Sequence, residues 1–259
     1  MKIVVFDLDE TLGYFTQFGI FWDCLKHCLN SVMTQTEFDE VLDLYPEFLR
    51  PNVLNILSFL KTKKRTNDCH KIMLYTNNTG VREWARQIVS YFEKKVHDPK
   101  LFDQIIGAFR VNGKRVEMCR TTYNKTLGDL VRCTKIPVDA EICFVDDSFH
   151  PAMAHENIYY INIKPYQYSL PFSEMMDRFK GSAIGHRLIE DYENFDMCML
   201  QFIQPFNYRV RGKNPREYEV DKVIGKSIVG HLRTFFHGDN RAKTVKNRGQ
   251  RRNRTFRYR

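Results

Sequence analysis

The stretch Ile3-Val4-Val5-Phe6-Asp7-Leu8-Asp9-Glu10-Thr11-Leu12 decides the fold, because an apolar, β-branched run ends abruptly at acidic residues. Such a run is typical of a strand buried in a parallel sheet. Paired aspartates also occur in solvated loops and helix caps. Here, however, Asp7 directly abuts the buried run, where an unpaired carboxylate is costly and a bound cation removes the cost. We therefore predict a strand over 3–6 with chemistry at its carboxyl end.

Three later runs repeat this pattern, and each ends at polar residues. The runs and the residues that follow them are Ile72–Tyr75 before Thr76-Asn77-Asn78, Ile142–Val145 before Asp146-Asp147-Ser148, and Ile158–Ile163 before Lys164-Pro165. Segments with helical periodicity, near 53–60, 81–92 and 127–131, lie between them. Alternating strands and helices predict an α/β fold with a mostly parallel central sheet flanked by helices. Because ligands bind at the carboxyl ends of such strands, we expect the polar clusters to meet in one cleft.

The charge of the chain is concentrated at one end. The 259 residues are 43% hydrophobic and 27% charged, which excludes a wholly disordered chain. Of the net charge of +9, all comes from Arg241–Arg259, which holds nine Lys or Arg and no acid. Phosphate contacts by such a segment are independent of sequence, so nucleic acid is a candidate partner, with nuclear targeting or a solubilising tail as alternatives.

The seven cysteines are predicted to be reduced structural thiols. Their number is odd, and no metal-site spacing is completed. No secretory signal is visible, and no run of about 18 apolar residues predicts a membrane span. We therefore expect a cytoplasmic or nuclear protein that is not secreted and does not enter a membrane.

The acidic residues suit phosphoryl chemistry. A carboxylate such as Asp7 can attack phosphorus to form an aspartyl-phosphate. Asp9 can protonate the leaving oxygen and later activate water. Mg²⁺ prefers oxygen ligands and joins carboxylates to substrate phosphates, and Asp146 and Asp147 are placed to complete its shell.

These residues resemble the four motifs of the haloacid dehalogenase-like superfamily, in order and over about residues 1–165. The motifs are Asp7–Leu12, Thr76 after Leu74-Tyr75, Lys125, and Val145–Ser148. Further segments resemble the branch that dephosphorylates the C-terminal domain of RNA polymerase II, also called NLI-interacting-factor-like phosphatases. They are Leu49–Val53, Tyr123–Leu127 and Val145–Pro151. Related chains are encoded by large DNA viruses, and the compact form of this chain resembles them.

The resemblance implies a Rossmann-like fold, an Mg²⁺ cofactor and a role for each motif residue. The implied catalytic residues are Asp7 as nucleophile, Asp9 as acid and base, Thr76 on the phosphoryl oxygens and Lys125 as the neutralising cation, with Lys135 as its rival. The implied metal ligands are Asp7, Asp9 through its backbone carbonyl, Asp146 and Asp147, and the implied substrate contacts are Thr11 and Asn77. The branch typically has Asp-Asn at 146–147, which leaves open which of the two residues here touches the metal.

We predict three parts in the chain. Residues 1–182 form the phosphatase core with a small cap-like insertion at 14–50, residues 183–237 a helical extension packed on the core, and 238–259 a disordered basic tail. Aromatic residues of the insertion either line a peptide groove or cover the edge of the core. They are Phe15, Phe18, Phe21 and Trp22. His150, His155 and His186 show no ligand spacing and are expected to be surface or core residues.

The predicted function is an Mg²⁺-dependent phosphatase that acts through an aspartyl-phosphate on phosphoserine or phosphothreonine in proteins. An open cleft with a small cap favours a phosphoprotein over a small metabolite. The enzymatic alternative is a polynucleotide phosphatase that holds its substrate with the basic tail. A third alternative is a catalytically idle protein of the same fold that binds nucleic acid.

Overall fold

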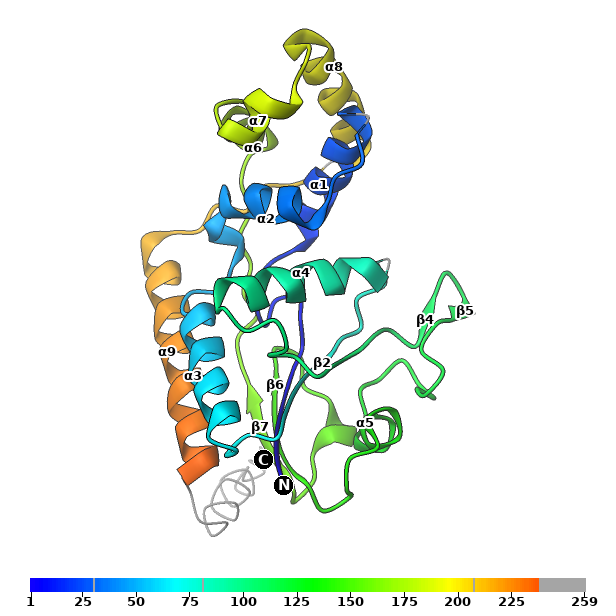
Figure 1. Ribbon diagram of the computed structural model, residues 1–259, viewed down its shortest axis with the longest axis vertical. Helices are drawn as coiled ribbons and strands as arrows, with labels where there is room; N and C mark the ends of the chain where they lie inside the picture. Colours follow the sequence, from blue (N-terminus) through cyan, green and yellow to red (C-terminus); the bar gives the residue numbers. More distant parts are fainter. Residues whose placement is uncertain (30, 81, 207, 238–259) are drawn as a thin grey trace, which may run out of the picture.

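The computed structural model describes residues 1–29, 31–80, 82–206 and 208–237. Its centre is a five-stranded, wholly parallel sheet in the order β3-β2-β1-β6-β7 (Figure 1). The strands are β1 (Lys2–Phe6), β2 (Lys71–Tyr75), β3 (Gln104–Ile106), β6 (Glu141–Asp146) and β7 (Ile158–Asn162). The predicted α/β class and parallel sheet are confirmed. The edge strand β3 was not predicted, because three residues are too few to show a period.

Helices cover both faces of the sheet. One face packs against α3 (Val53–Arg65) and α4 (Arg82–Lys95), and the other against α5 (Leu127–Thr134). Alternate residues of β1 divide between the two layers, with Val4 and Phe6 in the first and Ile3 and Val5 in the second. The long helix α9 (Pro215–His237) lies beside α3 and also contacts β7 (Figure 1).

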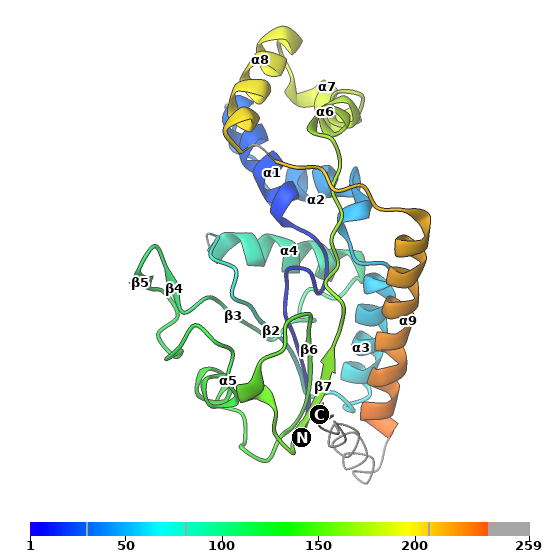
Figure 2. The same ribbon diagram turned by 180° about the vertical axis from the view of Figure 1, so that it is seen from behind.

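A second body of helices, which we call the helical lobe, stands above the carboxyl ends of the strands (Figures 1 and 2). Its elements are α1 (Thr16–Cys28), α2 (Gln35–Asp43), η1 (Pro46–Phe48), α6 (Phe172–Lys180), α7 (Ala183–Leu188), α8 (Tyr192–Ile203) and η3 (Gln204–Phe206). The lobe therefore joins the 14–50 insertion to a segment that follows it by more than a hundred residues. A hydrogen bond of 2.6 Å from the Tyr45 hydroxyl to the carbonyl of Met175 links the two segments.

The aromatic residues of the insertion form the core of the lobe. Phe15, Phe18, Phe21 and Trp22 are each fully buried. Phe18 contacts Phe38 edge-on, with 5.5 Å between ring centroids. Phe18, Phe21 and Trp22 line no part of the cleft below the lobe, so the interpretation that they line an exposed peptide groove is wrong, and the alternative that they cover the core applies to them. Phe15 is equally buried but borders that cleft.

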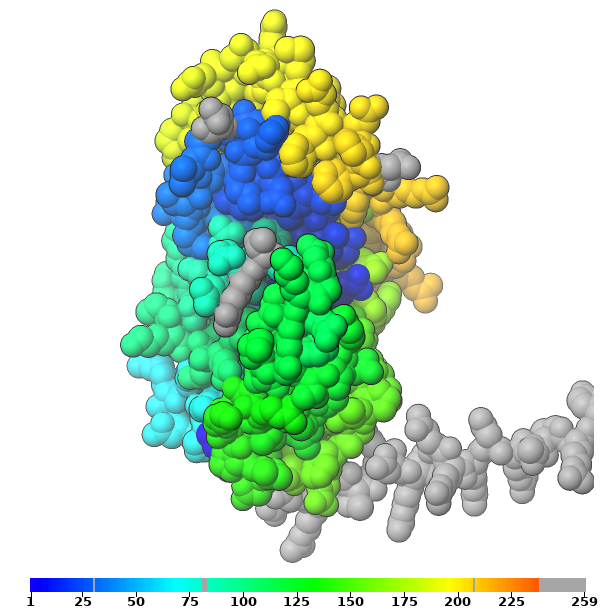
Figure 3. All heavy atoms as spheres, turned by 90° about the vertical axis from the view of Figure 1, so that its right-hand side faces the viewer, coloured from blue at the N-terminus to red at the C-terminus, as the bar shows by residue number. Residues whose placement is uncertain are grey.

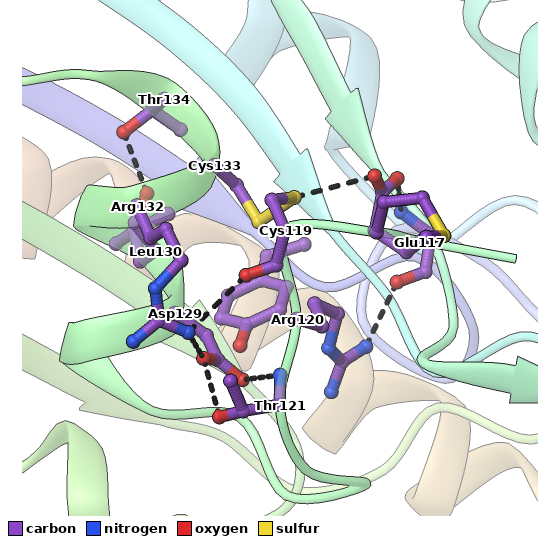
Figure 4. The surroundings of a disulfide bond; sticks show 12 residues. Glu117, Cys119, Arg120, Thr121, Asp129, Leu130, Arg132, Cys133 and Thr134 are labelled. Atoms are coloured by element: carbon purple, nitrogen blue, oxygen red, sulfur yellow. Dashed lines mark hydrogen bonds and ion pairs between the residues drawn. A yellow bond between two sulfur atoms is a disulfide. The ribbon is translucent and has the colours of Figure 1, made fainter. Parts of the chain in front are cut away.

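Two disulfide bonds correct the prediction of reduced cysteines. Cys28 of α1 is bonded to Cys198 of α8, and Cys119 is bonded to Cys133 of α5. Figure 4 shows the second bond beside the ion pair of Arg132 with Asp129. The partners lie 170 and 14 residues apart, so no spacing in the sequence signalled either pair. Free thiols remain at three buried positions, Cys24, Cys69 and Cys143.

A short hairpin and a 3-10 turn complete the described elements. The hairpin consists of β4 (Arg110–Val111) and β5 (Lys114–Arg115), and the turn is η2 (Pro151–Met153). At the hairpin tip, Asn112 and Gly113 both have positive φ, 49° and 76°, as the tight two-residue turn requires.

The end of α9 lies at the amino edge of the sheet. The Lys2 ammonium donates to the carbonyls of Phe235 and Phe236, at 2.8 and 3.1 Å. The predicted tail, 238–259, lies outside the described residues. Among the helices that the structure describes, none is long and apolar enough to cross a membrane.

Candidate active site

The loop after β1 presents the first two aspartates at the carboxyl edge of the sheet. The Asp7 amide continues the strand ladder by donating to the Val145 carbonyl of β6, at 2.9 Å. The loop then turns sharply at Glu10, whose φ of 57° is left-handed, and closes at Gly13. A Cβ on Gly13 would lie 2.6 Å from the carbonyl oxygen of Phe48, so only glycine fits there. The local chain path therefore fixes where Asp7 points.

Lys125 joins two of the predicted carboxylates. Its ammonium lies 2.6 Å from Oδ1 of Asp7 and 2.7 Å from Oδ2 of Asp146, and its side chain is 2% exposed. Lys125 lies two residues before the start of α5, and the hydroxyl of the intervening Thr126 caps this helix by accepting from the Asp129 amide at 3.0 Å. The rival Lys135 ends the same helix and is exposed. The structure thus brings Lys125, and not Lys135, to the acidic cluster.

The two aspartates after β6 are each held by hydrogen bonds. Oδ1 of Asp146 accepts from the Ser148 amide at 2.8 Å, and Oδ2 lies 3.5 Å from Nε2 of His150. The hydroxyl of Thr11 donates to Oδ1 of Asp147 at 2.9 Å. Thr11 is 1% exposed, so its side chain orients Asp147 and does not face the cleft. His150 had no assigned role in the sequence, because its approach to Asp146 depends on the turn between them.

The loop after β2 supplies a partner for Asp9. The side-chain amide of Asn78 donates to Oδ2 of Asp9 at 2.6 Å, and the backbone amide of Asn78 donates to the Thr76 hydroxyl at 3.0 Å. Oδ1 of Asp9 is buried and has no hydrogen-bond partner among the described residues. Asn77, the predicted contact, is exposed in the cleft, whereas the equally polar Asn78 beside it was not singled out.

Burial sets the electrostatics of the cluster. Burial, together with the charge of Asp146 and against that of Lys125, raises the pKa of Asp7 to about 7. Burial also raises the pKa of Asp9, opposed by the hydrogen bond from Asn78. For Asp146, burial is outweighed by the hydrogen bond from His150 and by Lys125, so its pKa is lowered. Burial therefore raises the pKa of Asp7 and Asp9, whereas the pKa of Asp146 is lowered.

The acidic cluster fits a divalent cation. Asp7, Asp146 and Asp147 each offer one carboxylate oxygen, and these three atoms lie within 4.8 Å of one another. The donor set is all oxygen, which suits Mg²⁺. A cation there would also relieve the cost of placing three carboxylates together at a half-buried edge. The carboxylate of Asp9 is not part of this group.

The site opens into a cleft of about 870 Å³ between the sheet and the helical lobe. Asp7, Asp9, Thr76 and Asn77 lie along its floor, α1 and the start of α4 form its walls, and the hairpin tip reaches its rim. Figure 3 shows the green hairpin segment directly below the blue helices of the lobe. The ends of β1 and β2 thus meet in this cleft, and the end of β6 joins them through the carboxylates of Asp146 and Asp147, which lie beside Asp7.

A comparison with protein families shows to which family this chain belongs. A family model described as NLI interacting factor-like phosphatase matches residues 2–181, more than two-thirds of the chain. The chain belongs to this family. It is thus a phosphatase of the haloacid dehalogenase-like superfamily, a hydrolase of phosphoric monoesters, as predicted. No curated protein and no solved structure matches the chain.

Membership in the NLI interacting factor-like family implies phosphatase activity and agrees with a metal site at the acidic cluster. Phosphatases of this superfamily generally use Mg²⁺, which agrees with the oxygen cluster at Asp7, Asp146 and Asp147. The family match ends at 181, so all of α7, α8 and α9 lie beyond it. The resemblance to viral chains stays a prediction.

Proposed function

We propose that this phosphatase acts through an aspartyl-phosphate on Asp7, with Mg²⁺ as its cofactor. The observation that carries the proposal is the contact of one buried ammonium, that of Lys125, with Asp7 at 2.6 Å and Asp146 at 2.7 Å. This cation offsets the repulsion between an attacking carboxylate and an anionic phosphate. Thr76, at the neighbouring strand end, offers its hydroxyl to the phosphoryl oxygens.

The proposed reaction has two steps. A carboxylate oxygen of Asp7 forms a bond to phosphorus as the bond to the leaving oxygen breaks, and Asp9 gives its proton to that oxygen. Asp9 then takes a proton from water, the water oxygen bonds to phosphorus, and the bond to Asp7 breaks to release phosphate. Burial raises the pKa of Asp9, which favours the protonated form that the first step needs.

The proposed metal ligands are Asp146, Asp147 and Asp7, together with the backbone carbonyl of Asp9. When bound, Mg²⁺ would supply positive charge to the transferring phosphoryl group. Thr11 holds Asp147 toward this position through its 2.9 Å hydrogen bond. Ser148 does the same for Asp146 from the backbone.

For the substrate, we propose phosphoserine or phosphothreonine in a protein. The cleft of about 870 Å³ extends well beyond a phosphate, between α1 and the hairpin, so it has room for a peptide chain. A polynucleotide phosphatase is the second candidate, favoured by the exposed basic residues Arg110, Lys114 and Arg115 in the hairpin. The assembled set of Asp7, Asp9, Thr76 and Lys125 argues against an idle scaffold.

The decisive experiment is Asp7→Asn assayed on a generic aryl phosphate with and without Mg²⁺. We expect at least a 10³-fold loss of kcat, because the amide does not serve as the nucleophile. Asp23→Asn is the matched control, since Asp23 lines the same cleft but belongs to α1 and is 62% exposed. It should retain activity within twofold. Equal turnover by Asp7→Asn and the parent protein overturns the mechanism.

A substrate panel separates the two candidate classes. The panel compares phosphopeptides, phosphorylated oligonucleotides and small phosphorylated metabolites, each with and without Mg²⁺. Turnover of phosphopeptides with oligonucleotides ignored supports the protein substrate, and the reverse supports the polynucleotide.

The proposed nucleic-acid contact rests on Arg241–Arg259. Deletion of 241–259 should spare aryl phosphatase activity and weaken binding to RNA or DNA in a salt-dependent way. Binding that is equal at low and high salt contradicts the role of the tail. A cytoplasmic or nuclear location belongs to the same proposal and is tested by cell fractionation.

A further inference from the structure

Arg50 holds the backbone of the catalytic loop from behind. Its side chain is buried, with 1% of its surface exposed. Nε donates to the carbonyl of Thr11 at 2.5 Å, and Nη2 donates to the carbonyls of Glu10 at 2.5 Å and Lys164 at 2.9 Å. One guanidinium thus fixes two consecutive peptide groups of the loop that carries Asp7 and Asp9.

The position it fixes is a strained one. Glu10 is left-handed, with φ of 57°, a conformation that is unfavourable for a residue other than glycine. The carbonyl of Glu10 accepts a second hydrogen bond, from the Tyr166 amide at 2.8 Å. Such strain persists only where surrounding contacts determine the backbone. Without Arg50 the loop would lose the contact that joins Glu10 to Thr11.

The charge of Arg50 is balanced from outside the matched segment. Burial lowers the pKa of Arg50 to about 10, and the carboxylate of Asp221 on α9 is the group that opposes this most. Asp221 is 1% exposed and forms an ion pair with Lys213. Arg50 and Lys213 both lie over the ring of Tyr166, at 5.4 and 4.2 Å from its centroid. A buried cluster therefore connects α9 to the catalytic loop.

Helix α9 is seated directly on the turn that carries Arg50. A Cβ on Gly225 would lie 2.1 Å from the carbonyl oxygen of Pro51, closer than any side chain tolerates. The side-chain amide of Asn52 donates to the Gly225 carbonyl at 3.0 Å. A side chain at 225 would push α9, and Asp221 one turn earlier, away from Arg50.

We propose that Arg50 is a positioning residue for the 7–11 loop, and that α9 completes this device by supplying Asp221 and the close contact at Gly225. Arg50 touches no reacting atom and acts through the backbone of Glu10 and Thr11. The helix beyond the family match is thus part of the catalytic apparatus. This inference rests on the proposed role of the loop in the reaction.

The first test compares Gly225→Ala with Gly230→Ala in the full chain. Both substitutions lie in α9, but a Cβ on Gly230 meets no atom within 4 Å. With an aryl phosphate, well below the melting temperature, we expect Gly225→Ala to lower kcat at least tenfold with KM changed less than threefold. Gly230→Ala should stay within twofold in both constants. A folded Gly225→Ala variant with normal kcat overturns the role of α9. This holds also if its melting temperature is lowered, because the substitution then affects stability alone.

The second test addresses the guanidinium itself. Arg50→Ala should lose at least 100-fold in kcat, and millimolar guanidinium should restore part of it, because the ion can occupy the space left by the side chain. Guanidinium should not restore Gly225→Ala. Arg50→Lys should recover less than the ion, since an ammonium does not reproduce the fork. Failure of rescue in a folded Arg50→Ala variant overturns the positioning role.

The activity of Asp7→Asn separates a failure of the proposed mechanism from a failure of the inference about α9. If that variant is inactive while Gly225→Ala is fully active, only the inference about α9 fails. If Asp7→Asn is active, the proposed mechanism fails whatever the other variants do.

Discussion

The sheet and the helical lobe are built from the chain in different ways. Strands β1, β2 and β6 each end at residues that reach the site. Helices α3, α4 and α5, which lie between these strands in the sequence, pack on the sheet itself. The lobe instead combines 16–48 with 172–206, and the bond between Cys28 and Cys198 closes it. The sheet region holds charged residues in contact, whereas the lobe interior is aromatic. Chemistry is therefore concentrated in one region and scaffold in the other.

The largest effect is expected at the charged contact in the sheet region. Lys125→Met leaves Asp7 and Asp146 buried without their cation, which should cost about 3–5 kcal/mol of folding free energy. It should also lower kcat by roughly 10²–10³-fold. Lys135→Met, an exposed lysine ten residues later, should change neither. Thermal melting and aryl phosphate kinetics on both variants check this, and a mild Lys125 phenotype would remove the contrast between the regions.

A substitution within the lobe should act on stability and not on chemistry. Phe18→Ala removes a fully buried ring that contacts Phe38 and Trp84, and should cost about 3–5 kcal/mol. At a temperature where the variant is folded, kcat should be unchanged. Phe206→Ala is the control, because this ring is 47% exposed, and it should cost about 1 kcal/mol or less. A large fall in kcat for folded Phe18→Ala would mean that the lobe takes part in the chemistry.

The two disulfides give a further comparison between the lobe, which holds the Cys28–Cys198 bond, and the sheet region, which holds the Cys119–Cys133 bond. Their loops span 170 and 14 residues, so the chain-entropy model predicts that removing the lobe bond costs about 2 kcal/mol more than removing the other. Cys28→Ser/Cys198→Ser and Cys119→Ser/Cys133→Ser, unfolded in urea, measure the difference. Equal costs would contradict the entropic account.

Thiol titration checks the pairing on which that comparison depends. Denatured, unreduced protein should expose three thiols, and reduction should raise the number to seven. In the native protein Cys24 and Cys69 should be unreactive at neutral pH, because burial raises the pKa of each to about 12.

The sequence predicted the sheet region better than it predicted the helical lobe and the contacts between loops. The strand ends at 7, 76 and 146 were visible because each apolar run is local and stops at polar residues. The contacts of Asn78 with Asp9 and of His150 with Asp146 were not, because each depends on the path of a loop. Arg50 was noted only as part of a motif, and its role needs the position of α9. The pairing of α1 with α8 joins segments whose contact no local period records.

The fastening of α9 at Lys2 has a practical consequence. Lys2 begins β1 and Asp7 follows its end, so the helix terminus and the cleft lie at opposite poles of the sheet. A bead or surface attached after residue 237 would bind the molecule at the end of the sheet opposite the cleft. The enzyme, immobilised in that way, would keep its cleft accessible to substrate in solution.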